Sequence, residues 1–277
     1  MGFNPSSPNL NDILDFFLHL FESGLSYNTV NTARSALSAL FPQFQGPTPL
    51  GEHPMVTRML KGIYNVRPTQ AKYAGVWDVR PVLNLLRKWS PCHKLSLKLL
   101  TFKITMLLAL TTGQRVQTLH RMNLDCLRKD KGGYTCSFKE VLKHSKPSKV
   151  APTVEVRAYP PDRRLCPSTY LSHYLQTTET LRDETTQLFI SIQQPHGPVS
   201  PDTIRRWILQ TLKTAGVDTL QYQAHSTRAA STSTAATMVD IDSVLKKAGW
   251  ASETTFRKFY NKPILGGDAF AAAVLSQ

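Results

Sequence analysis

Residues 95–119 decide the fold, and they read LSLKLLTFKITMLLALTTGQRVQTL. The apolar run inside this stretch ends shortly before Gly113, so we predict a buried helix over 95–111 that stops at this glycine. The run is too short to span a bilayer and carries Lys103 inside it. The stretch therefore predicts a core helix of a globular domain, with Arg115 held at the junction beyond its end.

The composition fits a globular protein with a polyanionic partner. The chain has 277 residues, of which 41% are hydrophobic, so it can bury the core of one large domain or of two ordinary ones. Lys and Arg total 33 against 19 Asp and Glu, a net charge of +14. Such a field favours DNA, RNA or an anionic membrane, and the charge alone does not choose among them.

The cysteines and the N-terminus indicate the compartment. Four cysteines lie far apart, without a CxxC pair or zinc-like spacing, at Cys92, Cys126, Cys136 and Cys166. We therefore predict free thiols in a reducing compartment. The N-terminus lacks a charged-then-apolar signal pattern, so we expect an intracellular protein, nuclear if its substrate is DNA.

Apolar residues at helical spacing predict three helices in the first part of the chain, over 10–21, 26–41 and 54–64. The second of these carries Asn28, Asn31 and Arg34 on its polar face. Short polar and basic groups of this kind can reach base edges and phosphates when a helix lies in a groove. An ordinary solvated face predicts the same residues, and both interpretations stay open.

The helical pattern breaks before the second part of the chain. Residues 67–80 lack periodicity and include Arg67 and Lys72, which predicts a basic linker between two domains. Such a linker can lie along a phosphate backbone while it joins domains on opposite faces of a duplex. A plain surface loop is the alternative.

The second part combines helices with a small sheet. Two alternating segments, 134–142 and 150–158, predict strands joined by the basic turn 143–149. Helices are predicted on both sides of them, over 81–89, 166–178, 201–215, 225–238, 240–249, 254–260 and, in the tail, 268–275. The fold class is therefore mainly α with a small β-sheet, in two domains.

Four local patterns carry the residue types of phosphate chemistry. Arg115 follows a helix-ending glycine, His225 and Arg228 share a helical face, Trp250 follows a second such glycine, and Tyr260 stands near the C-terminus. Each has an ordinary alternative as a surface pair or a packing residue. All of these patterns together, in this order along the chain, are much less expected by chance than any single one of them.

In that order these residues resemble the tyrosine recombinase and phage integrase family. The family pattern runs TG-x-R, a lysine on a strand turn, HxxR, then G-H/W and a nucleophilic tyrosine, and the resemblance covers roughly 77–260. Three further segments look most like the recombinases of DIRS-like retrotransposons: SALS at 35–38, WDV at 77–79 and FRKFYNKP at 256–263.

The resemblance implies a division of the chain. Residues 1–66 would form a helical, SAM-like core-binding domain and 67–80 the linker. Residues 81–265 would form the α+β catalytic domain. The tail, 266–277, would dock on a neighbouring protomer or pack on its own domain. Many core-binding domains have a further helix upstream of 10–21, which leaves open whether the chain is a piece of a longer protein.

The resemblance also implies a role for each residue of the pattern. Arg115 and Arg228 would clamp the scissile phosphate, with His225 beside them to accept or donate a proton. Trp250 would take the position that many members fill with His. Tyr260 would be the nucleophile, forming a 3′-phosphotyrosyl intermediate without metal or cofactor.

Lysines and other polar groups complete the expected site. Lys143 best matches the family's general acid, and Lys146 is the alternative. The partner would be double-stranded DNA, on which the protein self-associates into a dimer or tetramer, and the reaction would integrate a mobile element. The residues expected to contact DNA are Asn28, Asn31, Arg34, Lys61, Arg67, Lys72, Lys146, Lys149, Arg205 and Arg206.

The chain departs from the family at two places. Thr118 stands where many members have an acidic residue. Trp250 and Tyr260 are ten positions apart rather than the usual nine, and Phe259 fills the nearer position. One residue turns a helical side chain by about 100°, so the segment that carries the tyrosine must differ locally.

Two other functions fit parts of this pattern. A domesticated, catalytically inactive DNA-binding protein would keep the charge and the fold. A topoisomerase would use the same chemistry to relax supercoils. A metal-dependent nuclease fits poorly, because the sequence shows no cluster of carboxylates that could hold a metal.

Overall fold

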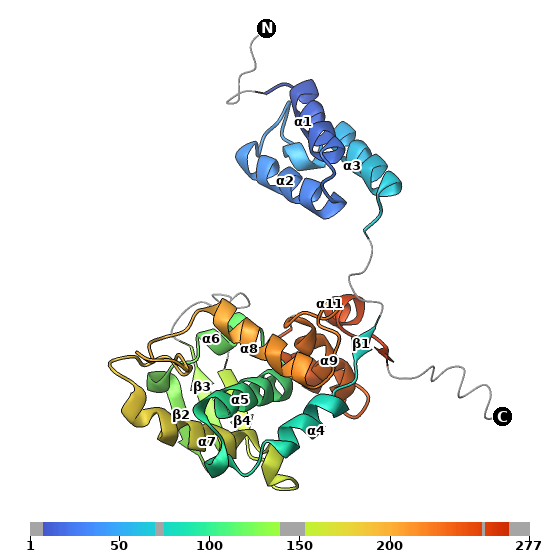
Figure 1. Ribbon diagram of the computed structural model, residues 1–277. Helices are drawn as coiled ribbons and strands as arrows, with labels where there is room; N and C mark the ends of the chain where they lie inside the picture. Colours follow the sequence, from blue (N-terminus) through green and yellow to red (C-terminus); the bar gives the residue numbers. More distant parts are fainter. Residues whose placement is uncertain (1–7, 70–74, 139–152, 251–252, 266–277) are drawn as a thin grey trace, which may run out of the picture. The chain divides into compact units, whose positions relative to one another are not determined.

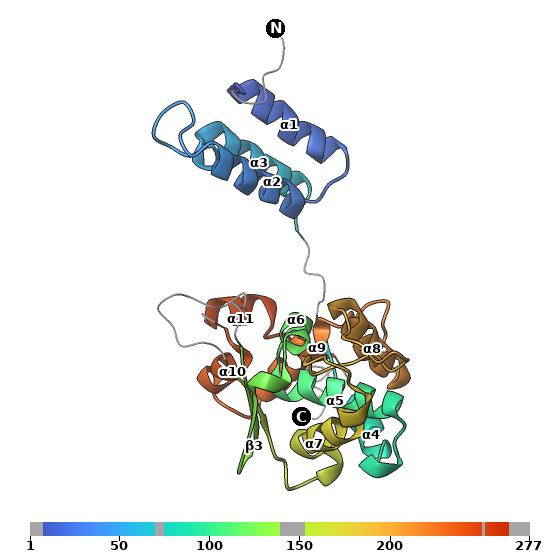
Figure 2. The same ribbon diagram turned by 90° about the vertical axis from the view of Figure 1, so that its left-hand side faces the viewer.

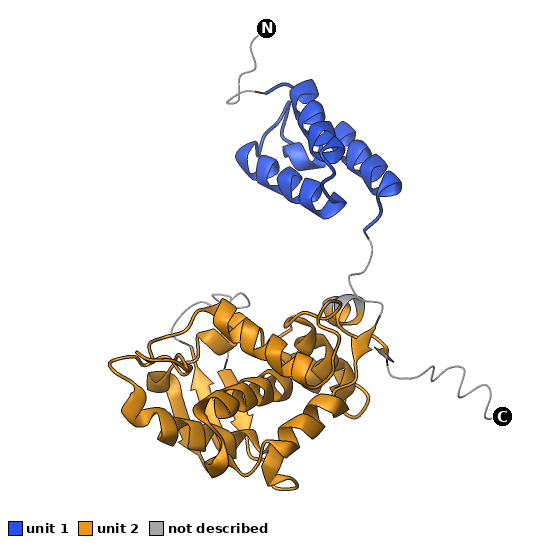
Figure 3. Cartoon of the chain, in the orientation of Figure 1, with its two compact units in different colours: residues 1–72 blue, residues 73–277 orange. Residues whose placement is uncertain are grey.

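The computed structural model describes residues 8–69, 75–138, 153–250 and 253–265 (Figures 1 and 2). The chain divides into two compact units, residues 1–72 (unit 1) and 73–277 (unit 2) (Figure 3). Across the ranges described, the helices are all too short or too polar to cross a membrane.

Unit 1 packs three helices around a small apolar core. A capping box starts the first helix: the side chain of Asn9 accepts from the backbone N–H of Asp12 at 3.0 Å, and the Asp12 carboxylate accepts from that of Asn9 at 2.9 Å. Phe17, Val30 and Val56 are fully buried between the helices. The three helices predicted here are confirmed as α1 (Leu10–Glu22), α2 (Tyr27–Leu40) and α3 (Pro54–Val66).

Arg67 belongs to unit 1 rather than to a free linker. Its guanidinium donates to the carbonyl oxygens of Phe21 at 3.2 Å and Leu25 at 2.7 Å. It also lies 4.3 Å from the centroid of the Phe21 ring. These contacts hold Arg67, the first residue of the predicted linker, against the end of α1 and the turn after it.

Unit 2 is built around one buried helix. Helix α5 is the predicted core helix, and α7, α8, α9 and strand β4 pack against it (Figure 1). Its side chains from Leu100 to Ala109 are all buried, as the apolar run predicts. The described helices of this unit are α4 (Arg80–Lys88), α5 (Leu97–Thr112), α6 (Val116–His120), α7 (Pro167–Thr178), α8 (Pro201–Thr214), α9 (Ser226–Ala235), α10 (Ile241–Ala248) and α11 (Glu253–Phe259).

Short 3₁₀ helices connect several of these elements. They are η1 (Leu50–Glu52) in unit 1 and η2 (Cys92–Lys94), η3 (Leu124–Cys126), η4 (Arg163–Leu165) and η5 (Glu179–Leu181) in unit 2. In Figure 2, α10 and α11 lie together on one side of α9, and α8 lies on the other side.

One face of a three-stranded antiparallel sheet covers the core. The strands follow the order β2 (Leu127–Asp130), β3 (Gly133–Ser137) and β4 (Thr153–Arg157). Val154 and Val156 are buried while their neighbours in β4 are exposed, which is the period-2 pattern that predicts this strand. Strand β2 was not predicted, because its sequence LRKD does not alternate. The basic turn 143–149 lies outside the described residues.

A second, two-stranded sheet corrects the predicted linker. Within 67–80, residues Val76–Trp77 form β1, which pairs in parallel with β5 (Ile264–Leu265). Val76 and Trp77 are 1% and 4% exposed. A strand this short has no sequence period of its own and forms only because β5 returns beside it. The helical fold class with a small sheet is confirmed, but this part of the linker belongs to unit 2.

Candidate active site

The site begins where α5 ends. Gly113 has a left-handed φ of 59°, and a Cβ there would lie 3.2 Å from Cγ2 of Thr232 and 3.4 Å from Cβ of Ala248. A glycine therefore lets the end of α5 lie close against α9 and α10. Two residues later, half-buried Arg115 is the N-cap residue of α6, and its carbonyl accepts from the backbone N–H of Thr118 at 2.9 Å.

Arg228 lies at this junction, on the first turn of α9, and only 2% of it is exposed. One guanidinium nitrogen, Nη1, donates to the carbonyl oxygen of Gly113. The guanidinium carbon lies 3.9 Å from the centroid of the Trp250 ring. Nε and Nη2 are buried and make no hydrogen bond to any residue in the described ranges. Arg228 thus keeps two donors open in a place where water is largely excluded.

The surroundings of Arg228 destabilise its positive charge. Burial, followed by the nearby positive charge of Arg115, lowers the pKa of Arg228 from 12.5 to about 10, while Tyr260 acts in the opposite direction. The guanidinium still carries its proton at neutral pH. Two neighbouring cations, one of them with unsatisfied donors, would be stabilised by an anion that binds between them.

Tyr260 brings a phenol to the same place from the end of α11. Its ring centroid lies 4.7 Å from that of Trp250 and 5.6 Å from the guanidinium carbon of Arg228. The phenol oxygen lies 3.4 Å from Nε2 of His225, whose side chain is exposed. The oxygen is therefore reached from solvent on one side and from the buried guanidinium on the other.

Trp250 combines the two roles that the sequence left open. It is 9% exposed and packs against Phe256, with ring centroids 5.0 Å apart, as a core residue does. Its indole Nε1 is buried and has no hydrogen-bond partner among the described residues. A ring fixed by the core thus holds an open donor beside Arg228 and Tyr260.

The start of α9 is fixed by a contact that sequence reasoning missed. The indole Nε1 of Trp77 donates to Oγ of Ser226 at 2.9 Å, and that hydroxyl donates to the carbonyl of Gln223 at 2.7 Å. Strand β1 therefore supports the turn that carries His225. Trp77 was noticed only through the family resemblance, and Ser226 offers no signal of its own because it stands in a run of small polar residues.

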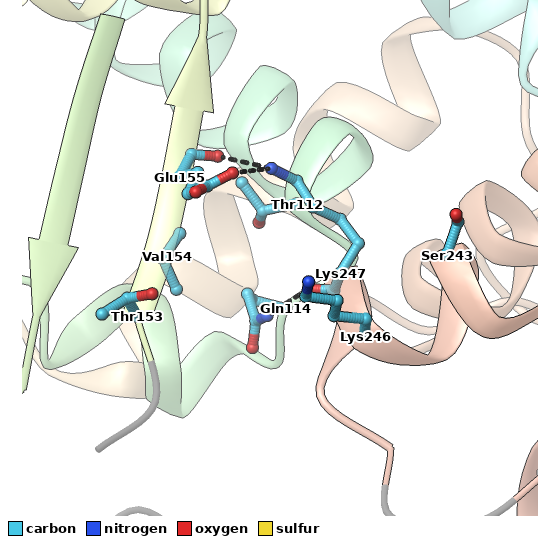
Figure 4. A pocket seen from close by; sticks show the side chains of 8 residues that line it. All are labelled: Thr112, Gln114, Thr153, Val154, Glu155, Ser243, Lys246 and Lys247. Carbon is cyan, nitrogen blue, oxygen red and sulfur yellow. Dashed lines mark hydrogen bonds and ion pairs between the residues drawn. The ribbon is translucent and has the colours of Figure 1, made fainter. Parts of the chain in front are cut away.

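A pocket of about 280 Å³ lies next to the junction, lined by residues of β4, α10 and the end of α5 (Figure 4). Lys247 reaches from α10 to β4, where Nζ donates to the carbonyl of Glu155 at 3.1 Å and lies 3.4 Å from its carboxylate (Figure 4). Gln114 Nε2 donates to the carbonyl of Lys247 at 3.2 Å. Arg157, followed by Lys247, keeps the pKa of Glu155 below its usual value. These contacts join the sheet, α10 and the turn before Arg115.

The structure does not describe the lysines that the sequence predicts for the site. Lys143, Lys146 and Lys149 lie outside the described residues, and so does Lys72. The choice between Lys143 and Lys146 as general acid stays a prediction. In the described part of the chain, His, Cys, Asp and Glu nowhere form a group of three that could hold a metal ion.

Some of the residues expected to contact DNA are exposed, and others are half-buried or bonded within the protein. In unit 1, Asn28 and Lys61 are exposed, whereas Arg34 is half-buried and donates to the carbonyl of Gly51 at 3.5 Å. Asn31 is also half-buried, and its side-chain oxygen is inaccessible to solvent. On α2, Arg34 and Asn31 are thus only partly exposed, and the choice between a DNA-contacting face and a solvated face stays a prediction.

The two arginines expected on α8 are exposed and partnered. Arg205 pairs with Asp202 at 3.0 Å, and Arg206 donates to the hydroxyl of Thr203 at 3.1 Å. Both contacts lie on the surface, where such bonds contribute little and exchange readily. Both side chains therefore stay accessible to a phosphate backbone.

The fold and the site together define a class of protein. Three solved structures share this fold. Their sequence identities to this chain are low, so the similarity shows the fold alone. The XerH site-specific recombinase, bound to palindromic difH substrate, has a TM-score of 0.64 at 16% identity, covering 96% of this chain and 72% of that chain. The Tn1549 transposon integrase, in complex with circular intermediate DNA, has a TM-score of 0.59 at 14% identity, covering 99% and 87%. A lambda integrase dimer bound to a COC′ core site has a TM-score of 0.56 at 16% identity, covering 95% and 67%.

The helices and three-stranded sheet of unit 2 are thus those of a tyrosine recombinase catalytic domain. Residues 82–263 match the phage integrase family, and the chain belongs to that family. A search of the curated proteins found no match. The family prediction made from the sequence is confirmed.

Proposed function

We propose that this chain is a site-specific DNA recombinase that cleaves and rejoins DNA through a 3′-phosphotyrosyl bond to Tyr260. One observation carries the proposal. The phenol oxygen of Tyr260 lies 3.4 Å from Nε2 of His225, and the centroid of the Tyr260 ring lies 5.6 Å from the guanidinium carbon of Arg228. Nε and Nη2 of Arg228 have no partner among the described residues and could bind an anion. A nucleophile, a proton acceptor and an anion site thus meet within one subunit.

The open donors suit the charge that develops during phosphoryl transfer. Arg228, Arg115 and the indole N–H of Trp250 would hold the two non-bridging oxygens of the scissile phosphate. Because Arg228 and Trp250 are already buried and fixed, they need no reorganisation when negative charge grows on these oxygens. In a site from which water is excluded, such donors are more effective than in water.

The bond changes balance without an external energy source. The Tyr260 oxygen attacks phosphorus while its proton passes to His225, whose contact with the phenol can tighten when DNA binds. The bond from phosphorus to the 5′ oxygen breaks, and a general acid, Lys143 or Lys146, protonates the leaving oxygen. The product is again a diester, so a 5′-hydroxyl from a partner strand can reverse the step and release Tyr260.

The biological setting is proposed from the sequence and from the relatives. The segments at 35–38, 77–79 and 256–263 look like recombinases of DIRS-like retrotransposons, which favours integration of a mobile element in a nucleus. Among the proteins of the same fold, one is a transposon integrase on circular intermediate DNA, and lambda integrase forms a tetramer on a Holliday junction. The net charge of +14 suits double-stranded DNA as partner and assembly on it.

Domain roles complete the proposal. Unit 1, with Asn28 and Lys61 exposed, would bind DNA as a core-binding domain, and unit 2 would carry the chemistry. The tail 266–277 lies outside the described residues, and its docking on a neighbouring protomer stays a prediction. Residues Ile264–Leu265 pair with β1, so a truncation that tests the tail has to begin at Gly266.

The test is capture of the covalent bond. Nicked duplexes with a randomised core serve as suicide substrates, so the target site need not be known in advance. The wild-type chain should form an SDS-resistant adduct, and Tyr260→Phe should form none, because a phenyl ring has no nucleophilic oxygen. DNA binding should persist in this variant. Tyr159→Phe, which removes the hydroxyl of an exposed tyrosine in the same unit, is the matched control.

The outcomes separate the competing functions. DNA binding without an adduct in the wild-type chain would indicate an inactive DNA-binding protein and overturn the proposal. An adduct that leads to plasmid relaxation but not to exchange between two sites would indicate a topoisomerase. An adduct retained in Tyr260→Phe would assign the nucleophile to another residue.

A further inference from the structure

Ser233 makes two hydrogen bonds to the main chain of the segment that carries Tyr260. Its hydroxyl donates to the carbonyl oxygen of Tyr260 at 2.5 Å and accepts from the backbone N–H of Lys262 at 3.2 Å. The side chain is 2% exposed, so water competes little for these bonds. One buried hydroxyl thus uses its donor and an acceptor position on both sides of Asn261.

The segment needs such a partner because α11 ends there. The backbone N–H groups of Tyr260 and Asn261 both donate to the carbonyl of Phe256, at 2.8 and 2.9 Å. The last carbonyls of a helix have no acceptor role within it, and the chain then turns towards β5. Ser233 satisfies the Tyr260 carbonyl at this turn and fixes the first residues beyond it.

Helix α9 therefore holds Tyr260 at two points. His225, at the start of the helix, contacts the phenol oxygen, and Ser233, near its end, contacts the main-chain carbonyl. The two residues are eight positions apart, which corresponds to about 12 Å along the helix axis. Arg228 projects from the same helix between them. One rigid element thus sets the position of the nucleophile relative to the guanidinium.

We propose that Ser233 is a positioning residue that keeps the phenol of Tyr260 in line with a phosphate held by Arg228. This inference rests on the proposed function, since it assigns a role within that reaction. Without the hydroxyl, the Tyr260 carbonyl and the Lys262 N–H lose their buried partner, and the turn after α11 can shift. A misplacement of about 1 Å at a reacting atom can cost about 10²-fold in rate.

The first test separates the rate of cleavage from DNA affinity. Ser233→Ala should form the covalent adduct about 10–100-fold more slowly in single turnover with saturating suicide duplex, while its affinity for the duplex stays unchanged. Alanine is the best helix former, so α9 should remain folded, which a thermal melt checks. Ser231→Ala is the matched control, because its hydroxyl bonds within α9, to the carbonyl of Arg228 at 3.2 Å. Its adduct should form at the wild-type rate.

The second test replaces the nucleophile. In a Tyr260→Phe background, hydrogen peroxide supplies the attacking oxygen: its oxygen bonds to phosphorus, and the 5′ oxygen leaves as a hydroxyl group. Because this attack does not use Tyr260, Ser233→Ala with Tyr260→Phe should cleave with peroxide at the rate of Tyr260→Phe alone. A purely structural role of Ser233 would slow both reactions.

The results distinguish this inference from the function on which it rests. If Ser233→Ala forms the adduct at the wild-type rate, or slows peroxide cleavage as much as tyrosine cleavage, the positioning role is wrong and the recombinase function stands. If the wild-type chain forms no adduct at all, the proposed function fails and the positioning role fails with it.

Discussion

Two buried cations in the described part of unit 2, Lys103 and Arg228, differ in how the protein satisfies them. Lys103 lies in the middle of α5 with 0% exposed, and its ammonium donates to the carbonyls of Leu86 at 2.6 Å and Trp89 at 2.5 Å. It also lies 3.8 Å from the centroid of the Tyr170 ring. Arg228 is almost as deeply buried, and within the described ranges its Nη1 donates to the carbonyl of Gly113 while Nε and Nη2 have no hydrogen-bond partner. Both carbonyls near Lys103 are satisfied by its ammonium, whereas two donors of Arg228 are left open by the described residues.

The difference shows how a fold separates a structural charge from a functional one. Lys103 satisfies carbonyls at the end of α4, where a helix lacks internal donors. Removing it would leave buried acceptors without a partner. Arg228 keeps two donors that have no partner among the described residues, which is a destabilising arrangement unless a ligand completes it. In the function proposed above, that ligand would be a phosphate diester.

The largest expected effect is on the rate of adduct formation, which should depend on Arg228 but not on Lys103. Arg228→Met should lower the single-turnover rate of adduct formation by about 10²–10³-fold, as loss of one preorganised donor does. Lys103→Met should leave the rate within about threefold, because the Lys103 ammonium bonds to carbonyls at the end of α4 rather than to the candidate site residues. Both are measured with the suicide duplex below the melting temperature. Equal losses in the two variants would contradict the distinction.

The next effect is on the free energy of unfolding, where Lys103→Met should cost more than Arg228→Met. Lys103→Met should lower the free energy of unfolding by about 1–3 kcal/mol, because the carbonyls of Leu86 and Trp89 lose their donor. Arg228→Met should cost less, because loss of the bond to the Gly113 carbonyl is offset by removal of two buried donors that have no partner in the described ranges. Urea unfolding of both variants measures this. If Arg228→Met lost as much as Lys103→Met, Arg228 would be a structural cation.

The last expected effect is a gradual change of stability with pH, which is small within any one pH unit. Burial lowers the pKa of Lys103 from 10.5 to about 7. Between these values the unfolded chain binds one more proton than the folded protein, so stability due to this group rises with pH. The free energy of unfolding of wild type minus that of Lys103→Met should therefore increase from pH 7 to pH 9.5, by at most ~1.4 kcal/mol per pH unit. A flat difference would mean that the two carbonyls keep the ammonium charged throughout.

Most helices could be predicted because their signals are local. Apolar spacing marks the buried face, and cap residues mark the start: Ser26, Ser96, Ser200 and Asp240 each accept from a backbone N–H in the first turn. Strands β1 and β2 and the short α6 were not predicted. Each is too short or too polar to show a period. Strand β1 depends on β5, far away in the sequence, whereas β2 forms beside its neighbour β3.

The site could be predicted in its main residues but not in its supports. Arg115, His225, Arg228, Trp250 and Tyr260 were identified from their types and order, and the structure places the last four in mutual contact or near contact. Ser226 and Ser233 were not identified. Both stand in the small polar sequence of α9, STRAASTSTA, where a serine carries no signal of what its hydroxyl contacts.

The sequence by itself determined the chemistry of the side chains, the helices whose signals lie within a turn or two, and the family. Only the tertiary structure decided which polar groups are satisfied and which stay open. Gly113, whose carbonyl accepts from Arg228, is 115 positions from Arg228 in the sequence. Tyr260, whose carbonyl accepts from Ser233, is 27 positions from Ser233. Satisfaction of a buried donor depends on such distant groups, so local sequence cannot show it.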